Sequence, residues 1–182
     1  MKKNIIATLV AALILFFWQF LSQAALDLHK SEHLYTATQD SILNVLANTG
    51  LKEGKYVMPM EDPALGYEAQ MKYAESHVGK PMAILDYKTS NSANMGMNLL
   101  RGILVNILIM FLFISLLNKT NMSGFKSILI ASLSIGCIGF LNHAYTNYIW
   151  YHSTDIYMDL LDAIAGWGLS GIWLGYYLRK DQ

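Results

Sequence analysis

The chain has 182 residues, of which 54% are hydrophobic and only 14% are charged, whereas typical soluble domains carry roughly 25% charged residues. Thirteen Lys and Arg balance thirteen Asp and Glu, so nothing favours nucleic-acid binding, which needs a basic face. The single cysteine, Cys137, excludes an internal disulfide and any site built from several cysteines. Because the apolar residues form long blocks, the sequence predicts an integral membrane protein.

Four segments are apolar enough, or nearly so, to cross a bilayer, which takes about 20 residues of helix. They lie at residues 5–21, 99–117, 125–150 and 160–178. The last two also carry polar residues and glycines, which is typical of helices that face other helices. The predicted fold is an all-α membrane bundle of four transmembrane helices, with a small α+β extracytoplasmic cap between helices one and two. Its three parts are residues 1–25 (helix one), 26–97 (the cap) and 98–182 (helices two to four).

Basic residues flank the four segments on one side of the predicted bundle: Lys2, Lys3, Lys119, Lys126, Arg179 and Lys180. Because Lys and Arg accumulate in cytoplasmic loops, this side should be the cytoplasm. The sequence thus predicts a multi-pass protein of the cell (inner) membrane, with both termini cytoplasmic and residues 26–97 outside. Helix one should be a retained signal anchor. A cleaved secretory signal is the alternative, although the apolar run 5–21 is longer than such signals usually have.

The cap, residues 26–97, has six Lys and nine Asp and Glu and therefore a net charge of −3 (6 − 9). Its first helix should follow a capping box from Thr36 to Gln39 and stop at Gly50. Its second helix should span residues 64–77, with Asp62 as the N-cap. A region of this size buries little core, so the cap should lean on the membrane helices or on a partner.

Two short strands are expected in the cap, at residues 55–58 and 82–87. The second helix lies between them in the sequence. Since a parallel pair needs a long crossover connection that is usually helical, we expect these strands to pair in parallel.

Polar and ionisable residues gather near the predicted outer ends of the four helices: Gln19, Arg101, Asn142, His143, Asp159 and Asp162. Counted at 1.5 Å per residue, they fall in one slab beneath the cap. Charges in a membrane are costly unless they are paired, so we expect Arg101 to form an ion pair with Asp162 or Asp159. Gln19 and His143 should lie within hydrogen-bonding reach. The cluster is either a structural clasp or an outward-facing pocket, and its interfacial depth favours the clasp.

A second pattern, His29-Lys-Ser-Glu32-His33, matches the zinc motif H-x-x-E-H, in which two histidines bind the metal and the glutamate acts as a base. The motif is short and directly follows a membrane helix, which favours an exposed juxtamembrane segment. The sequence therefore predicts no catalytic residue and no cofactor, and it leaves zinc at His29, Glu32 and His33 as an alternative.

Small residues recur in the last two membrane segments. Gly171 and Gly175 form a G-x-x-x-G pair, and Gly136 and Gly139 lie in the preceding segment. Small residues let membrane helices approach closely. We expect these glycines to serve packing within the chain first and contact in a homo-oligomer second.

Four stretches carry a resemblance to known sequences: 16–21 (FFWQFL), 97–102 (MNLLRG), 145–150 (YTNYIW) and 161–168 (LDAIAGWG). In these stretches the chain resembles an uncharacterised family of small bacterial four-helix integral membrane proteins of unknown function. The resemblance covers most of the chain and implies the four-helix layout. It supplies no catalytic residue.

These observations favour a non-enzymatic accessory, assembly or sensing subunit in the lipid bilayer, whose cap contacts a membrane or periplasmic protein. One alternative is a small homo-oligomeric transporter or channel that uses the outer polar cluster. The second alternative is a metal-dependent membrane enzyme. No nucleic-acid partner is expected.

Overall fold

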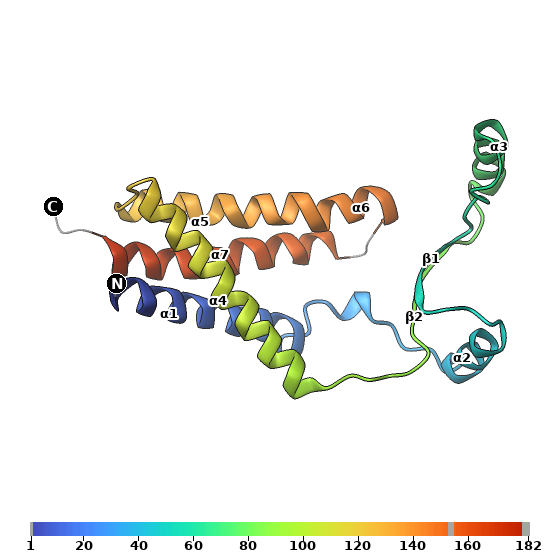
Figure 1. Ribbon diagram of the computed structural model, residues 1–182, viewed down its shortest axis with the longest axis horizontal. Helices are drawn as coiled ribbons and strands as arrows, with labels where there is room; N and C mark the ends of the chain where they lie inside the picture. Colours follow the sequence, from blue (N-terminus) through green and yellow to red (C-terminus); the bar gives the residue numbers. More distant parts are fainter. Residues whose placement is uncertain (1, 153–154, 180–182) are drawn as a thin grey trace. The chain divides into compact units, whose positions relative to one another are not determined.

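A computed structural model describes residues 2–152 and 155–179 of the chain (Figure 1). The chain divides into two units. The first, here called the helical unit, combines Met1–Leu34 with Asn94–Gln182, and the second, the small unit, is Tyr35–Ala93. The small unit is thus shorter at both ends than the cap predicted over residues 26–97.

The helical unit consists of long helices joined by short connections: α1 (Lys2–Phe20), a π-helical turn η1 (Leu21–Ala25), a 3-10 turn η2 (Lys30–Glu32), α4 (Met95–Lys119), α5 (Phe125–Phe140), a π-helical turn η3 (Leu141–Tyr145), α6 (Thr146–Tyr151) and α7 (Ile156–Leu178). Among the described residues, three helical segments are long and apolar enough to cross a membrane: Lys2–Ala25, Met95–Lys119 and Phe125–Tyr151. The prediction of a membrane-spanning protein is therefore supported, with three candidate spans. The remaining long helix, α7, is not among them; its first turns carry Asp159 and Asp162, and glycines and aromatic residues recur along it.

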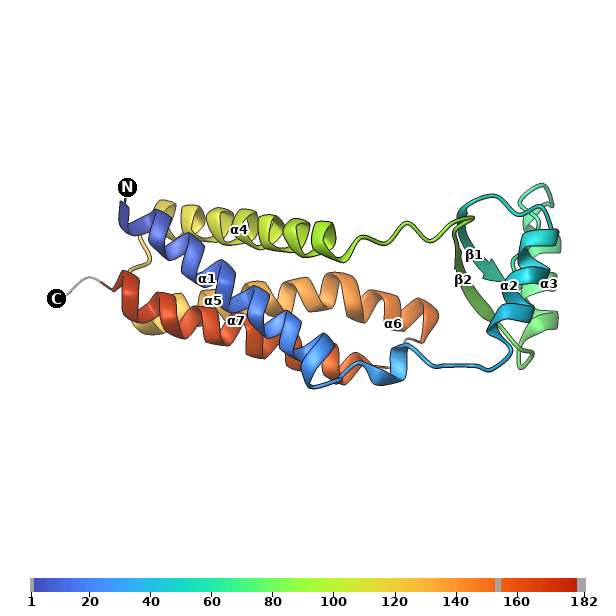
Figure 2. The same cartoon turned by 90° about the horizontal axis from the view of Figure 1, so that it is seen from below.

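Within the helical unit, α7 packs against both α1 and α5, and α4 packs chiefly on α1 (Figures 1 and 2). The core between them is apolar and comprises Ala7, Ala11, Ala12, Leu15, Met110, Phe113, Ile114, Leu117, Ile128 and Leu174. Most larger apolar side chains on the outer faces of α1 and α4 are exposed. That distribution suits helices surrounded by lipid.

Glycines bring α5 and α7 close together. A Cβ on Gly171 would lie 2.6 Å from Ser132 Cβ, and a Cβ on Gly175 would lie 2.7 Å from Phe125 Cδ2. A Cβ on Gly136 would lie 2.8 Å from the backbone oxygen of Ala163 on α7. The expectation of packing within the chain is thus confirmed for Gly136, Gly171 and Gly175 but not for Gly139, where a Cβ would meet nothing within 4 Å.

The helices of the helical unit alternate in direction. As a result, the start of α1, the end of α4, the start of α5 and the end of α7 lie at one end of this unit (Figures 1 and 2). The basic residues that flank the predicted spans share this end, except for Lys180, which lies outside the described residues. The first turn of α7, with its aspartates, lies at the opposite end.

The small unit contains α2 (Gln39–Asn48), β1 (Gly54–Met58), α3 (Tyr67–His77) and β2 (Ala83–Tyr87). The two strands pair antiparallel, from Gly54 opposite Tyr87 to Met58 opposite Ala83, so the prediction of parallel pairing is wrong. Its physical reason is visible in Figure 1, where α3 lies beyond the ends of the strands instead of crossing a face of the sheet. Without a helix over that face, nothing covers a parallel pair, which normally has both faces buried.

The N-caps of the helices in the small unit differ from the predicted ones because of local hydrogen bonds. The N-cap of α2 is Thr38, whose side chain caps nothing, and Thr36 Oγ1 instead lies 3.0 Å from Thr38 Oγ1. Asp62 does not cap α3, which begins after Gly66; its Oδ1 accepts a hydrogen bond from the Ala64 amide at 2.9 Å in a separate turn. Short polar side chains readily form such local turns in place of caps. The predicted stop of α2 is confirmed, because Gly50 follows the helix with φ of +73°.

Candidate functional site

The side chain of Asp162 on α7 joins three hydrogen-bond donors from the first part of the chain. Asp162 Oδ1 accepts from Trp18 Nε1 at 3.1 Å, and Oδ2 accepts from Ser22 Oγ at 2.8 Å. Oδ2 also lies 3.0 Å from His29 Nε2. Because an ionised carboxylate only accepts, the hydrogen of the imidazole is on Nε2. Asp162 therefore fixes both the position and the tautomer of His29.

The backbone after α1 brings these donors to α7. Residues 21–25 form a π-helical turn, closed by a 2.7 Å hydrogen bond from the Leu26 amide to the Leu21 carbonyl oxygen. Asp27 then adopts a positive φ of 53°, and the Lys30 amide bonds back to the Asp27 carbonyl oxygen. The chain thus turns sharply directly after helix one. This turn places Ser22 and His29 beside the same carboxylate.

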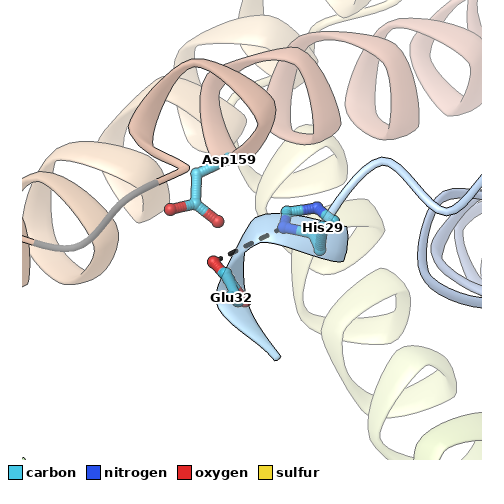
Figure 3. A group of neighbouring side chains, drawn as sticks. All are labelled: His29, Glu32 and Asp159. Atoms are coloured by element: carbon cyan, nitrogen blue, oxygen red, sulfur yellow. Dashed lines mark ion pairs between the residues drawn. The ribbon is translucent and has the colours of Figure 1, made fainter. Parts of the chain in front are cut away.

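His29 faces two further carboxylates, those of Glu32 and Asp159 (Figure 3). Each of these three residues offers one potential ligand atom, and these atoms all lie within 4.8 Å of one another. His29 Nδ1 is 3.5 Å from Glu32 Oε1. The His29 side chain is only 4% exposed, and its Nδ1 has no hydrogen-bond partner. Glu32 and Asp159 are more exposed, so the group is open on one side.

The surroundings of His29 are acidic. Burial lowers the pKa of His29, but the hydrogen bond and charge of Asp162, together with Glu32, outweigh burial and raise the pKa above its usual value. Asp155, just before α7, is buried and accepts a hydrogen bond from Ser31 Oγ. Three carboxylates therefore lie near one imidazole, and a fourth, that of Asp155, lies near Asp159. Such a concentration of negative charge attracts cations.

The structure brings together only part of the predicted outer polar cluster. Within the described residues, Arg101 is exposed and makes no ion pair with Asp159 or Asp162, so the predicted ion pair is not formed. The physical reason is that α4 packs chiefly on α1, which leaves Arg101 away from α7. Asn142 and His143 are exposed on the π-helical turn η3.

The remaining predicted site residues do not all lie beside the aspartates either. Gln19 Oε1 accepts a hydrogen bond from Asn106 Nδ2 at 2.9 Å and so joins α1 to α4 instead of reaching the aspartates. Of the motif H-x-x-E-H, His29 and Glu32 lie in the group with Asp159, whereas His33 is exposed and lies outside it. The third candidate ligand comes from α7, not from the motif.

The sequence analysis missed Asp155 and also Trp18 and Ser22, the two donors from the end of α1 to Asp162. Trp18 has the appearance of an interfacial aromatic, and Ser22 lies where a signal peptide could end. They are four positions apart and so share one face of a helix, which is the signal that could have paired them. No sequence pattern predicts the π-helical turn that brings Ser22 beside Asp162.

Other polar groups of the helical unit are used between helices. Ser132 Oγ donates to the Trp167 carbonyl oxygen at 2.6 Å, and Ser170 Oγ donates to the Ala11 carbonyl oxygen at 3.4 Å. A hollow of about 490 Å³ between α4 and α5 has a mostly apolar lining that includes Phe113. The acidic group at the start of α7 is therefore the best candidate for a binding site in this unit.

Comparison with known proteins gives no match to a family description, a curated protein or a solved structure. The chemistry of the site consequently rests on its own residues. One buried imidazole and two partly exposed carboxylates can bind a cation.

Proposed function

We propose that this protein is a non-enzymatic accessory or sensing subunit of the inner membrane, of the small bacterial four-helix type, and that residues 35–93 bind a partner protein outside. The observation that carries this proposal is the near absence of an interior in the small unit. Among Tyr35–Ala93, only Tyr87 is buried. Domains of about 60 residues normally bury roughly 60% of the surface that their unfolded chain exposes, so this unit lacks the means to be stable alone.

The apolar side chains that would build such an interior are exposed instead. On α2 they are Ile42, Leu43 and Val45, of which Val45 is 64% exposed. Met71 on α3 and Ile84 on β2 are exposed as well. Ile42 and Val45 are three positions apart and so share one face of α2, and exposed apolar patches mark surfaces that bind other molecules. A partner that covers them supplies the burial that the small unit lacks.

Charge favours a protein over a lipid surface as the partner. Residues 35–93 contain five Lys and seven Asp and Glu, which gives a net charge of −2 (5 − 7). Anionic headgroups attract basic segments and repel acidic ones. The partner surface should therefore be apolar with a basic rim.

The proposal includes four membrane crossings, with both termini in the cytoplasm. The basic end of the helical unit supports this orientation, because Lys and Arg accumulate on the cytoplasmic side. The 23 residues of α7 reach about 34 Å at 1.5 Å per residue, enough to cross the hydrocarbon core. Its close packing on α1 and α5 fits a span shielded from lipid.

Transport through the bundle has less support. Ser132, Ser170 and Asn106 are buried polar residues of the described helices, as is Thr8, and each of the first three is hydrogen-bonded to a neighbouring helix. Such bonds join helices and do not line a water-filled path.

The proposal is tested by crosslinking in native membranes, gentle solubilisation and mass spectrometry of what co-purifies with the tagged protein. The informative comparison is Val45→Glu against Asn44→Glu, since both put one negative charge on α2 and only the first disrupts the apolar surface. We expect a partner protein with the wild type and Asn44→Glu, and a recovery about tenfold lower with Val45→Glu, equal to about 1.4 kcal/mol. Equal recovery with both variants, or crosslinks only between copies of this chain, would overturn the proposal.

A further inference from the structure

The group of His29, Glu32 and Asp159 has the composition and spacing of a metal site. We propose that these three residues bind a divalent transition-metal ion of the Zn²⁺ type, with Asp162 as the residue that positions His29. The proposal goes beyond the partner-binding function and stands whether or not the small unit binds a protein.

The first argument is the state of His29 Nδ1. Since Nε2 carries the hydrogen that is donated to Asp162, a neutral ring presents the Nδ1 lone pair toward the other two carboxylates. That nitrogen is buried, has no hydrogen-bond partner and lies 3.5 Å from Glu32 Oε1. Two electron-rich atoms at this distance repel unless a cation, either a proton on Nδ1 or a metal ion, lies between them. A cation between them turns the repulsion into coordination.

The second argument is distance. Ligand atoms that share a Zn²⁺ ion at about 2.1 Å in tetrahedral geometry lie roughly 3.4 Å apart. His29 Nδ1 and Glu32 Oε1 are already separated by 3.5 Å. All three potential ligand atoms lie within 4.8 Å of one another (Figure 3). The other separations therefore exceed the expected value by at most about 1.4 Å (4.8 − 3.4).

The third argument is the support behind the ligands. Metal-binding histidines commonly donate their second ring N–H to a carboxylate, which fixes the ring and strengthens it as a ligand. Asp162 has this relation to His29 and is itself held by Trp18 and Ser22. The ring is therefore held in a binding orientation before any ion arrives.

The donor set selects the class of metal. One imidazole nitrogen with two carboxylate oxygens suits Zn²⁺ and similar borderline ions, whereas Ca²⁺ takes six to eight oxygen ligands. Three protein ligands and an open side leave a fourth position for water or a further ligand. The bound ion would link the segment after α1, which leads into the small unit at Tyr35, to the start of α7.

The full chain is purified in detergent and stripped of metal with a chelator. Zn²⁺ binding is then measured by calorimetric titration, and bound zinc is counted by elemental analysis. We expect one Zn²⁺ per chain. His29→Gln, Glu32→Gln and Asp159→Asn should each weaken binding by about tenfold or more, and Asp162→Asn should weaken it by about 10- to 100-fold. The matched control is His33→Gln, which removes an exposed histidine four residues away and should leave binding unchanged.

Two results would overturn the proposal. If His33→Gln weakens binding as much as His29→Gln, the ligands are those of the H-x-x-E-H segment and not Asp159. If Zn²⁺ does not bind, or binds equally to all variants, the group is a structural ion pair. Should His29→Gln fail to fold, Glu32→Gln and Asp159→Asn decide the matter, because both side chains are at least partly exposed and each substitution keeps the shape of the side chain.

Discussion

His29 Nε2 lies 3.0 Å from Asp162 Oδ2, and this contact joins two residues that are 133 positions apart in the chain. The same carboxylate also accepts from Trp18 and Ser22. Asp162 is therefore the point at which the end of helix α1 and the turn after it are fixed to α7. The chain continues from this turn to Leu34, the last residue of the helical unit before the small unit begins at Tyr35.

Asp162→Asn should destabilise the protein. One amide oxygen cannot accept from all three donors, and the new NH₂ group faces donors instead of acceptors. The expected loss is roughly 2–4 kcal/mol, in the range measured when a partner of buried polar groups is removed. Thermal unfolding of the chelator-treated protein in detergent measures it. Asp159→Asn, the same substitution one turn earlier, is the control and should cost less; equal melting temperatures for the two variants would contradict the role given to Asp162.

Arg101→Ala should change the free energy of unfolding by less than about 0.5 kcal/mol, as is usual for exposed positions without specific contacts. The reason is that Arg101 is exposed on α4 and does not pair with the aspartates of α7. The same melting experiment checks this. A charge-swapped double variant, Arg101→Asp with Asp162→Arg, should not recover the stability lost by the second change alone. Recovery would show that the two side chains interact after all.

The α5–α7 contact predicts opposite effects for two neighbouring glycines on α5. Gly136→Ala places a Cβ 2.8 Å from the backbone oxygen of Ala163, which cannot move aside easily. It should cost roughly 1–3 kcal/mol, as overpacking does. Gly139→Ala meets nothing within 4 Å and should be neutral or slightly stabilising, since Ala favours the helix. Melting temperatures that fall equally in both variants would argue against this close approach.

These comparisons show which features the sequence can predict. The membrane helices follow from long apolar runs, and the packing role of Gly171 and Gly175 follows from their spacing, because both signals are local. The partner of Asp162 is not a local property, since it depends on which helices are neighbours and on a π-helical turn after Phe20. The strand pairing failed for a related reason: a long connection permits a parallel pair but does not require one.

Low pH should weaken the contact between the segment before β1 and the segment after β2 in the small unit. Glu53 Oε1 accepts from Thr89 Oγ1 at 2.7 Å and from the Thr89 amide at 3.1 Å. These bonds hold the pKa of Glu53 below its usual value. A carboxyl whose pKa is lowered on folding adds stability above its unfolded-state pKa, and that stability is lost as the pH falls through the folded-state pKa.

The amide chemical shift of Thr89 in the full chain should therefore titrate with a midpoint below that of an ordinary glutamate. Thr89→Val removes the hydroxyl donor and should move the titration of Glu53 toward its usual value. A midpoint that is already ordinary in the wild type would mean that the two hydrogen bonds do not form in solution.

Cysteine labelling can decide which end of the helical unit faces outward. Starting from Cys137→Ser, which removes the half-buried thiol of α5, Ser76→Cys introduces a thiol at an exposed position of α3 and Asn118→Cys introduces one in the exposed last turn of α4. Because the end of α4 lies at the basic end of the unit, we expect an impermeant thiol reagent to label Ser76→Cys in intact cells and Asn118→Cys only after lysis. The reverse pattern would place the small unit and the acidic group of α7 in the cytoplasm. Labelling of both positions from the same side would mean that α4, the long helix between them, does not cross the membrane.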